Sequence, residues 1–293
     1  MTRILLTGAH GQLGQEFFAL HSGYPSMQWV WADRSLLDLS QPGAIAAFFE
    51  ESAPFDYCIH CAAYTAVDRA ESEPELAWRI NAEALSELAQ ACRKHRIRLI
   101  HFSSDYVYHN TLNRPLRESD PTTPVGVYGK SKLAGEKALL DLLPDSLIFR
   151  TSWVYSAFGT NFVKTMRRLG AERAELRVVC DQIGAPTYAR DLARAVLQLI
   201  AHPPANPVSG VFNYANEGVC SWYDFAQAIF EYSHIDCQVV PIPSSAYPSP
   251  ATRPTYSVLD TNHFKQTFSC TIPYWRDSLK ECIRVMHELS SKN

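Results

Sequence analysis

Three features of the sequence predict an α/β fold built around a parallel sheet. Short apolar runs alternate with helical patterns through the first half of the chain. A glycine-rich turn with Gly8, Gly11 and Gly14 follows the first of these runs. After about residue 155 the alternation loosens and proline-rich loops interrupt it. We therefore expect a Rossmann-like doubly wound sheet with helices on both faces, followed by a smaller C-terminal lobe.

The first half carries the strands of the predicted sheet. Each strand is a short apolar run, which is typical of a strand that is buried on both faces. Residues 75–93, rich in Ala, Leu and Glu, predict one of the intervening helices. We expect right-handed crossovers, and because the strands are parallel their carboxyl ends meet at one edge, where a ligand is expected. The strands are predicted at residues 4–6, 29–32, 57–61, 99–102 and 147–149.

The second half is expected to be less regular. Proline-rich loops at residues 203–207 and 241–254 interrupt it. We predict that residues 1–155 form a dinucleotide-binding domain. Residues 156–293 are predicted to form mainly a substrate-binding lobe, with some segments returning to the main sheet. Helices are expected over residues 161–169, 188–201, 221–232 and 277–289, and strands over residues 176–179, 211–214 and 238–240.

The composition argues against several classes of function. The chain has 293 residues, of which 46% are hydrophobic and 19% charged, as in a folded globular protein. Its net charge of −3 gives no reason to expect nucleic acid or an anionic membrane as a partner. No apolar run approaches the roughly 20 residues that span a bilayer. The N-terminus runs directly into the first predicted strand and does not resemble a cleaved signal, so we expect a cytoplasmic protein.

The eight cysteines lack the spacing of a disulfide framework, and we expect reduced thiols. Cys58 and Cys61 match a C-x-x-C pattern, but they lie in a predicted strand, where residues three apart point to opposite faces. No second pair accompanies them in the sequence, whereas a structural metal site usually needs about four ligands. We predict no metal site.

The glycine-rich turn predicts a binding site for a dinucleotide. Gly8, Gly11, Gln12, Leu13 and Gly14 lie between a predicted strand and a predicted helix. Glycines let the backbone approach a pyrophosphate, and the helix N-terminus offers N–H groups and the positive end of its dipole. An ordinary strand–helix turn can show the same pattern, but the position after the first strand of an α/β chain favours the cofactor.

The end of the second strand carries charges that bear on the choice of coenzyme. Asp33 can accept hydrogen bonds from a ribose hydroxyl and disfavours a 2′-phosphate, whereas Arg34 can bind that phosphate. Two exposed loop charges are the plain alternative. We therefore expect NADPH or NADH as the cofactor, without choosing between them. Asp38 and Leu39 belong to a loop that we expect to meet the adenine.

Small residues follow the third strand. Ala62 and Ala63, with Tyr64 and Thr65 after them, would let the cofactor lie against the backbone. Simple close packing of a helix explains the same residues equally well.

Three side chains farther along predict acid–base chemistry. Tyr128 and Lys132 are four residues apart, so they share one face of a helix. An ammonium beside a phenol favours the phenolate and is expected to lower the pKa of Tyr128, which suits a general acid near neutral pH. Ser104 ends the fourth strand and can bind a substrate oxygen, although turns and caps are the commoner use of serine.

These residues resemble the extended short-chain dehydrogenase/reductase superfamily and, within it, the dTDP-4-dehydrorhamnose reductase family. The resemblance covers nearly the whole chain. It implies reduction of the C4 ketone of dTDP-4-dehydro-L-rhamnose to dTDP-L-rhamnose, a step of cell-surface polysaccharide biosynthesis. The segments that carry it are residues 65–74, 104–108, 127–136, 149–155 and 181–187.

The resemblance also implies roles for single residues. Tyr128 would give a proton to the ketone oxygen while nicotinamide delivers hydride to the carbon. Lys132 would bind the nicotinamide ribose. Ser104 would hydrogen-bond the ketone oxygen, where the family more often has threonine.

Five further residues are predicted to bind substrate. Trp153 is expected to stack on the thymine base, although without the resemblance a core aromatic would be the simpler interpretation. Arg253 is expected at the diphosphate, with help from Asn161. Asp105 and Tyr106, next to Ser104, complete the set.

Alternatives remain at this point. The enzyme could reduce another nucleotide-4-keto-deoxysugar, or the chain could be a non-catalytic nucleotide-binding regulatory subunit. A dehydratase typically has an Asp-Glu pair here, but Tyr106 follows Asp105. Some relatives dimerise through magnesium held by an acidic residue where this chain has Arg190, so we expect a monomer or a weak homodimer.

Overall fold

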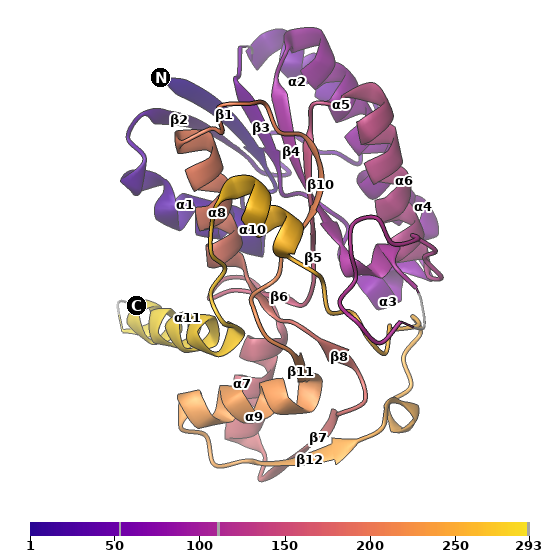
Figure 1. The fold of residues 1–293 in the computed structure, drawn as a ribbon, viewed down its shortest axis with the longest axis vertical. Helices are drawn as coiled ribbons and strands as arrows, with labels where there is room; N and C mark the ends of the chain where they lie inside the picture. Colours follow the sequence, from indigo (N-terminus) through magenta and orange to yellow (C-terminus); the bar gives the residue numbers. More distant parts are fainter. Residues whose placement is uncertain (53, 110–111, 292–293) are drawn as a thin grey trace.

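The computed structural model describes residues 1–52, 54–109 and 112–291, and Figure 1 shows a larger lobe around a sheet with a smaller lobe below it. Within the described residues the main sheet has six strands in the order β10-β5-β4-β3-β1-β2. Neighbouring strands all pair in parallel, which confirms the predicted fold class. The strands are β1 (Thr2–Thr7), β2 (Met27–Ala32), β3 (Tyr57–His60), β4 (Arg98–Ser104), β5 (Leu147–Thr151) and β10 (Gly210–Asn213).

The order of the strands reverses between β1 and β3, and this reversal places the ligand site. The chain passes from β1 outward to β2, and then returns to build β3, β4 and β5 on the other side. In doubly wound sheets ligands bind at such a point, outside the carboxyl ends of the strands. Here Gly8 follows β1 with φ +73°, and a Cβ built on it would lie 2.6 Å from the backbone nitrogen of Ala62 after β3. Only glycine fits between the two strand ends.

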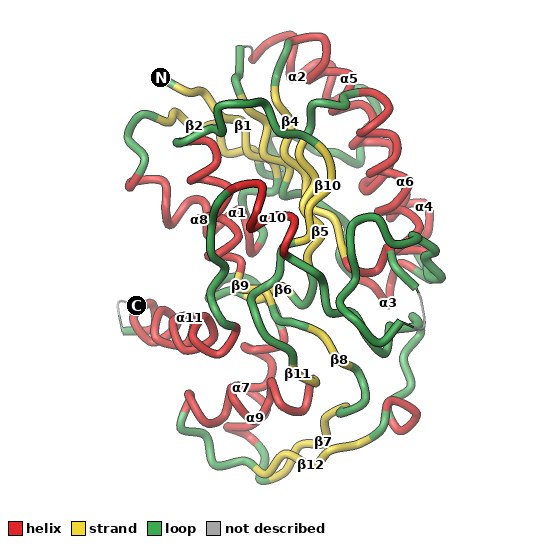
Figure 2. The backbone as a smooth tube through the Cα atoms, viewed as in Figure 1, coloured by secondary structure: helices red, strands yellow, loops and turns green. Residues whose placement is uncertain are grey.

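Helices cover both faces of the sheet and bury alternate residues of the same strand (Figure 2). Leu5 of β1 faces the core closed by α2, α5 and α6, whereas Ile4 and Leu6 face the core closed by α1, α8 and α10. This is the pattern of a strand buried on both sides. Besides the helices of residues 74–95, the larger lobe has α1 (Gln12–Leu20), α2 (Ala44–Ser52), α3 (Val67–Ala70), α6 (Val127–Leu142), α8 (Ala189–Ala201) and α10 (Asn262–Phe268).

The helix predicted over residues 75–93 is interrupted by a π-helical turn that carries Asn81. The buried amide of Asn81 accepts from the backbone nitrogen of Tyr64 at 2.9 Å, and donates to its carbonyl oxygen and to Ser131 Oγ, both at 3.1 Å. Single π turns are set by tertiary contacts and are frequent near functional sites. The segment runs as α4 (Pro74–Trp78), the π turn (Arg79–Glu83) and α5 (Ala84–His95).

The smaller lobe packs three helices around an aromatic core. The predicted strands near residues 176 and 238 pair with each other as β7 and β12, whereas the strand near residue 211 joins the main sheet as β10. Asn161 and Ser221 stand before their helices as N-caps that accept from backbone N–H groups. The elements are α7 (Phe162–Glu172), α9 (Trp222–Ser233), α11 (Trp275–Ser290), and the strands β6 (Val154–Tyr155), β7 (Glu175–Val179), β8 (Ile183–Gly184), β9 (Thr187–Tyr188), β11 (Cys220–Ser221) and β12 (Gln238–Ile242).

All eight cysteines are free thiols. In the described part of the chain, every helix is too short or too polar to cross a membrane.

Candidate active site

A cleft of about 690 Å³ lies at the carboxyl edge of the main sheet. Loops after β1, β3, β4 and β5, together with the first turns of α6, supply its walls. Most of the residues predicted to bind cofactor or substrate meet there: Gly8, Gly11, Gln12, Leu13, Ala62, Ala63, Thr65, Ser104, Asp105, Tyr106, Tyr128, Lys132, Trp153 and Asn161.

The glycine turn forms one wall of the cleft. Gly11 is the N-cap of α1, with φ −72° and ψ 168°. Gly14 lies one turn into the helix, where a Cβ would come within 2.4 Å of the carbonyl oxygen of Gly8. Gly14 is not among the residues that line the cleft; it lets α1 pack tightly against the turn. Gly11, Gln12 and Leu13 do line it, so the N-terminus of α1, with its free N–H groups, lies at the cleft.

The predicted adenosine side lies outside the cleft walls. Asp33 Oδ1 accepts from the hydroxyl and backbone nitrogen of Ser35 and from the backbone nitrogen of Leu36, at 2.6, 2.9 and 3.0 Å. The Ser35 hydroxyl and these N–H groups hold the pKa of Asp33 below its usual value. Arg34 is an exposed side chain whose Nε lies 3.2 Å from Asp38 Oδ2. Both charged side chains thus have partners within the loop, and Asp33 Oδ2 also lies 3.6 Å from His10 Nδ1.

Two other predicted cofactor residues point away from the cleft. The Tyr64 hydroxyl donates to Glu73 Oε2 at 2.7 Å, so only its backbone, held by Asn81, lies near the site. The Leu39 side chain is buried in the core under α2 and α5.

Tyr128 lies in the first turn of α6 and is buried in the cleft wall, with its ring edge-on to that of Tyr106. Burial raises the pKa of Tyr128 to about 12, and a hydrogen bond with Ser104 offsets only part of this effect. The sequence-based expectation of a lowered Tyr128 pKa is therefore wrong for the ligand-free chain. Burial of the phenol outweighs the effects that would lower its pKa, and Lys132, one turn along the helix, makes its hydrogen bonds with Phe102 and His101 instead.

Lys132 is 2% exposed, and its Nζ donates to the carbonyl oxygen of Phe102 at 2.7 Å and lies 3.2 Å from His101 Nε2. Both partners belong to β4. Burial lowers the pKa of Lys132 to about 8. The ammonium thus lies near the carboxyl end of the strand, in the wall of the cleft.

Ser104 and Asp105 link β4 to the cleft floor. Ser104 Oγ donates to Asp105 Oδ1 at 3.0 Å and accepts from the backbone nitrogen of Tyr106 at 3.2 Å. Asp105 Oδ2 is buried without a hydrogen-bond partner among the described residues. Burial raises the pKa of Asp105 to about 6.

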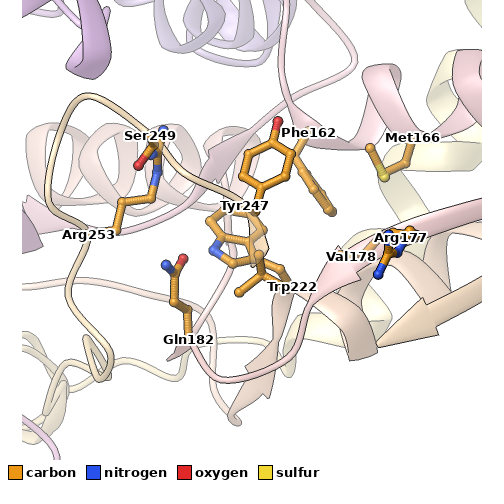
Figure 3. A pocket seen from close by; sticks show the side chains of 10 residues that line it. Phe162, Met166, Arg177, Val178, Gln182, Trp222, Tyr247, Ser249 and Arg253 are labelled. Atoms are coloured by element: carbon orange, nitrogen blue, oxygen red, sulfur yellow. The ribbon is translucent and has the colours of Figure 1, made fainter. Parts of the chain in front are cut away.

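A second cavity of about 310 Å³ lies in the smaller lobe. Figure 3 shows Arg253 and Ser249 toward one end, Met166 and Arg177 toward the other, and Tyr247 and Trp222 between them. Its walls are Phe162, Met166, Arg177, Val178, Val179, Gln182, Trp222, Tyr247, Ser249 and Arg253.

Trp153 stands between the cleft and the second cavity. It lines the cleft and stacks on Trp222 with ring centroids 3.6 Å apart and planes at 10°. Its φ of +48° is in the left-handed region, where a bulky side chain is strained. Arg253, predicted at the diphosphate, lines the second cavity rather than the cleft, and its guanidinium contacts Asp68 at 2.7 Å.

Asn161, predicted to help Arg253 bind the diphosphate, instead caps α7 and reaches the glycine turn. Its amide donates to Gln12 Oε1 at 2.9 Å, which ties the two lobes together beside the cleft. Arg190 forms an ion pair with the buried Glu16, at 2.7 Å from Nε to Oε2. Among the described residues no group of three His, Cys, Asp or Glu side chains could hold a metal.

Sequence analysis missed two residues that support the site. Asn81 gave no signal within a run of good helix formers. His101 did give one, because it is a polar residue inside an otherwise apolar predicted strand.

Comparisons with known proteins show the family of this chain. The family model described as RmlD substrate binding domain matches residues 1–288. The dTDP-4-dehydrorhamnose reductase of Burkholderia thailandensis is 40% identical over 295 residues, with 96% of this chain and 98% of the relative covered. The reductase of the same name from Salmonella typhimurium is 41% identical, with 97% of each chain covered.

Solved structures give the same result. A dTDP-4-dehydrorhamnose reductase of Bacillus anthracis, determined in complex with NADP, matches with a TM-score of 0.91 at 36% identity, covering 97% of this chain and 100% of that one. The counterpart from Clostridium acetobutylicum matches with a TM-score of 0.92 at 40% identity, covering 98% and 100%.

Proposed function

This chain belongs to the RmlD substrate binding domain family, whose relatives are oxidoreductases, and we propose that it reduces the C4 ketone of dTDP-4-dehydro-L-rhamnose to dTDP-L-rhamnose with NADPH or NADH. One observation carries the proposal. Ser104, Tyr128 and Lys132 line the same cleft as the glycine turn, so an acid, an ammonium and a dinucleotide site face one space. A non-catalytic nucleotide-binding subunit would have no need of this convergence.

The cleft fits a dinucleotide. Gly8 packs so closely on the backbone of Ala62 that no Cβ would fit between them. Gly11 is the N-cap of α1 and lines the cleft. The N-terminal N–H groups of α1 would hold the pyrophosphate, and Ala62 and Ala63 would let the coenzyme lie against the backbone. When bound, the nicotinamide supplies the hydride.

Tyr128 is the proposed proton donor. With a pKa of about 12 in the ligand-free chain, the phenol keeps its proton until negative charge develops on the ketone oxygen. Ser104, which shares a hydrogen bond with Tyr128, would bind the same oxygen and hold it beside the phenol. The Lys132 ammonium, one helical turn away, would stabilise the phenolate that remains.

The nucleotide half of the substrate would extend toward the second cavity. Trp153, Trp222 and Tyr247 offer aromatic faces for a base, and the guanidinium groups of Arg177 and Arg253 can bind phosphate oxygens. The stack of Trp222 on Trp153 means that one face of Trp153 is already covered. The base therefore has Trp222 and Tyr247 as further partners beside the predicted Trp153.

The test is turnover of dTDP-4-dehydro-L-rhamnose with NADPH and with NADH, and identification of the product by NMR. We expect dTDP-L-rhamnose; another deoxysugar would leave the reduction intact but change the substrate. Tyr128→Phe should lower kcat about 1000-fold and keep NADPH binding.

Tyr155→Phe is the matched control, because it removes a buried hydroxyl that has no hydrogen-bond partner in the described chain. It should keep full activity. Full activity in Tyr128→Phe would refute Tyr128 as the donor, and an inactive wild type that still binds NADPH would favour the regulatory subunit.

A further inference from the structure

A row of three polar side chains crosses the sheet beneath the cleft. Thr7, His60 and His101 are register neighbours near the carboxyl ends of β1, β3 and β4. Thr7 Oγ1 and His60 Nδ1 are 2.7 Å apart, and the two imidazole rings stack with centroids 5.3 Å apart at 23°. Each of the three residues is 1% exposed. The proton transfer proposed above uses none of them, so their burial needs another reason.

The row ends at the Lys132 ammonium. No carboxylate of the described residues makes an ion pair with Lys132, because Glu136, one turn along α6, is held by Arg150 at 2.6 Å. The two acceptors that Lys132 has are neutral: the carbonyl oxygen of Phe102 and, at 3.2 Å, His101 Nε2. A buried ammonium depends strongly on such acceptors.

The chemistry fixes the protonation of His101. An ammonium can only donate, so Nε2 must be the unprotonated nitrogen and the proton must be on Nδ1. Nδ1 has no hydrogen-bond partner among the described residues, so no donor there requires Nδ1 to be the unprotonated nitrogen. Burial, followed by the charge of Lys132 and by His60, keeps the pKa of His101 well below its usual value.

We infer that His101 is a positioning residue for the reaction: its neutral Nε2 holds the Lys132 ammonium at the end of β4, in the wall of the cleft that Ser104 and Tyr128 also line. This inference rests on the proposed function for the role of Lys132. The His60 ring, stacked behind His101, fixes its plane. The titratable groups that act on Lys132 are His101 and His60 from the sheet and Glu136 from its own helix.

The wild-type protein allows a test that needs no substrate. ¹⁵N NMR of the imidazole side chains should show His101 neutral between pH 6 and 8, with the proton on Nδ1. Lys132→Met should change the ¹⁵N chemical shift of His101 Nε2 more than that of any other histidine nitrogen. An Nε2–H tautomer, or a protonated His101 in this range, would overturn the inference.

Variants test the effect on catalysis. His101→Phe keeps an aromatic ring at this position but removes a hydrogen-bond acceptor of the ammonium, so the pKa of Lys132 should fall. The basic limb of the pH profile of kcat/KM should move down by about one unit, since the ammonium is lost at lower pH. His101→Gln, whose side-chain oxygen can replace Nε2, should restore most of the profile. His60→Phe is the control, because it disturbs the same core without removing the acceptor.

A merely structural role gives a different result. It would lower kcat in His101→Phe with an unmoved profile and without rescue by Gln, and that outcome would refute the inference. Lysine-selective NMR on the substrate-free protein, which has eight lysines, follows the pKa of Lys132 directly. If His101→Phe lowers the pKa of Lys132 but the wild-type protein does not reduce the keto-sugar, the inference about His101 and Lys132 stands and the proposed function is rejected.

Discussion

The cleft and the second cavity are built in different ways. The cleft is made by strand ends that are held in register, and its closest contacts are between backbones, such as Gly8 against Ala62. The second cavity is lined by residues of α7, β7, α9 and the loop before residue 254. In its wall the rings of Trp222 and Phe162 pack with centroids 4.7 Å apart. A backbone frame tolerates little displacement, whereas aromatic side chains can move by rotation about χ angles. The proposed reaction would therefore take place on the backbone frame rather than among mobile side chains.

Polarity divides the two regions in the same way. Ser103 Oγ, His101 Nδ1 and Asp105 Oδ2 are buried near the cleft without hydrogen-bond partners among the described residues. Such groups are costly to a fold and are retained mostly where function uses them. The second cavity is dominated by aromatic and aliphatic walls with guanidinium groups at its ends. The first region suits reaction and the second suits recognition.

The largest expected effect tests the rigidity of the cleft. In Gly14→Ala the new Cβ would lie 2.4 Å from the carbonyl oxygen of Gly8, so the turn must shift. We expect the free energy of unfolding to fall by about 3 kcal/mol, measured by urea denaturation, together with weaker NADPH binding. Gly11→Ala is the matched control, because its Cβ meets the same oxygen at 3.2 Å. If the free energy of unfolding of Gly14→Ala equals that of the wild type, the backbone of the cleft adapts as easily as the side chains of the second cavity.

A second prediction concerns the buried charge on the cleft floor. The folded pKa of Asp105, about 6, exceeds its ordinary value of 3.8, so its contribution to stability is lost as pH rises toward and through 6. Asparagine cannot ionise. The stability of Asp105→Asn relative to wild type should therefore grow by about 1 kcal/mol between pH 5 and pH 8 in urea denaturation.

The control is a carboxyl group whose pKa is shifted in the opposite direction. Asp120, whose pKa is lowered to about 2 chiefly by Arg114, stabilises the fold in its charged form, so Asp120→Asn should destabilise at both pH values. If Asp105→Asn showed no gain at pH 8, the cleft floor would be more hydrated than its burial indicates.

The smallest expected effect separates recognition from reaction. Trp222→Ala removes the ring that stacks on Trp153 and lines the second cavity. The KM for the nucleotide sugar should rise about threefold, or about 0.7 kcal/mol, because Trp153 and Tyr247 remain as partners for the base, while the KM for NADPH stays unchanged. Trp222→Phe should keep most of the affinity. An equal rise in both KM values would mean that the cavity and the cleft act as one site.

Regular elements account for what could be predicted. The strands of the main sheet and the glycine turn follow from local apolar runs and from glycine chemistry, and the cleft at their carboxyl ends follows from the topology. Tyr128 and Lys132 could be paired because four residues make about one helical turn. The π turn at Asn81 could not be predicted from the sequence, because its extra residue is stabilised by contacts with Tyr64 and Ser131 from other segments.

The sequence by itself determined which groups reach the edge of the sheet, because strand and helix periods assign a side chain to a face. Only the tertiary structure decided what each group touches there. It directed Lys132 to His101 rather than to the phenol, covered one face of Trp153 with Trp222, and engaged Arg253 with Asp68. Hydrogen bonds and stacking join residues far apart in the chain, and burial then sets their pKa values, so neither can be obtained from local spacing.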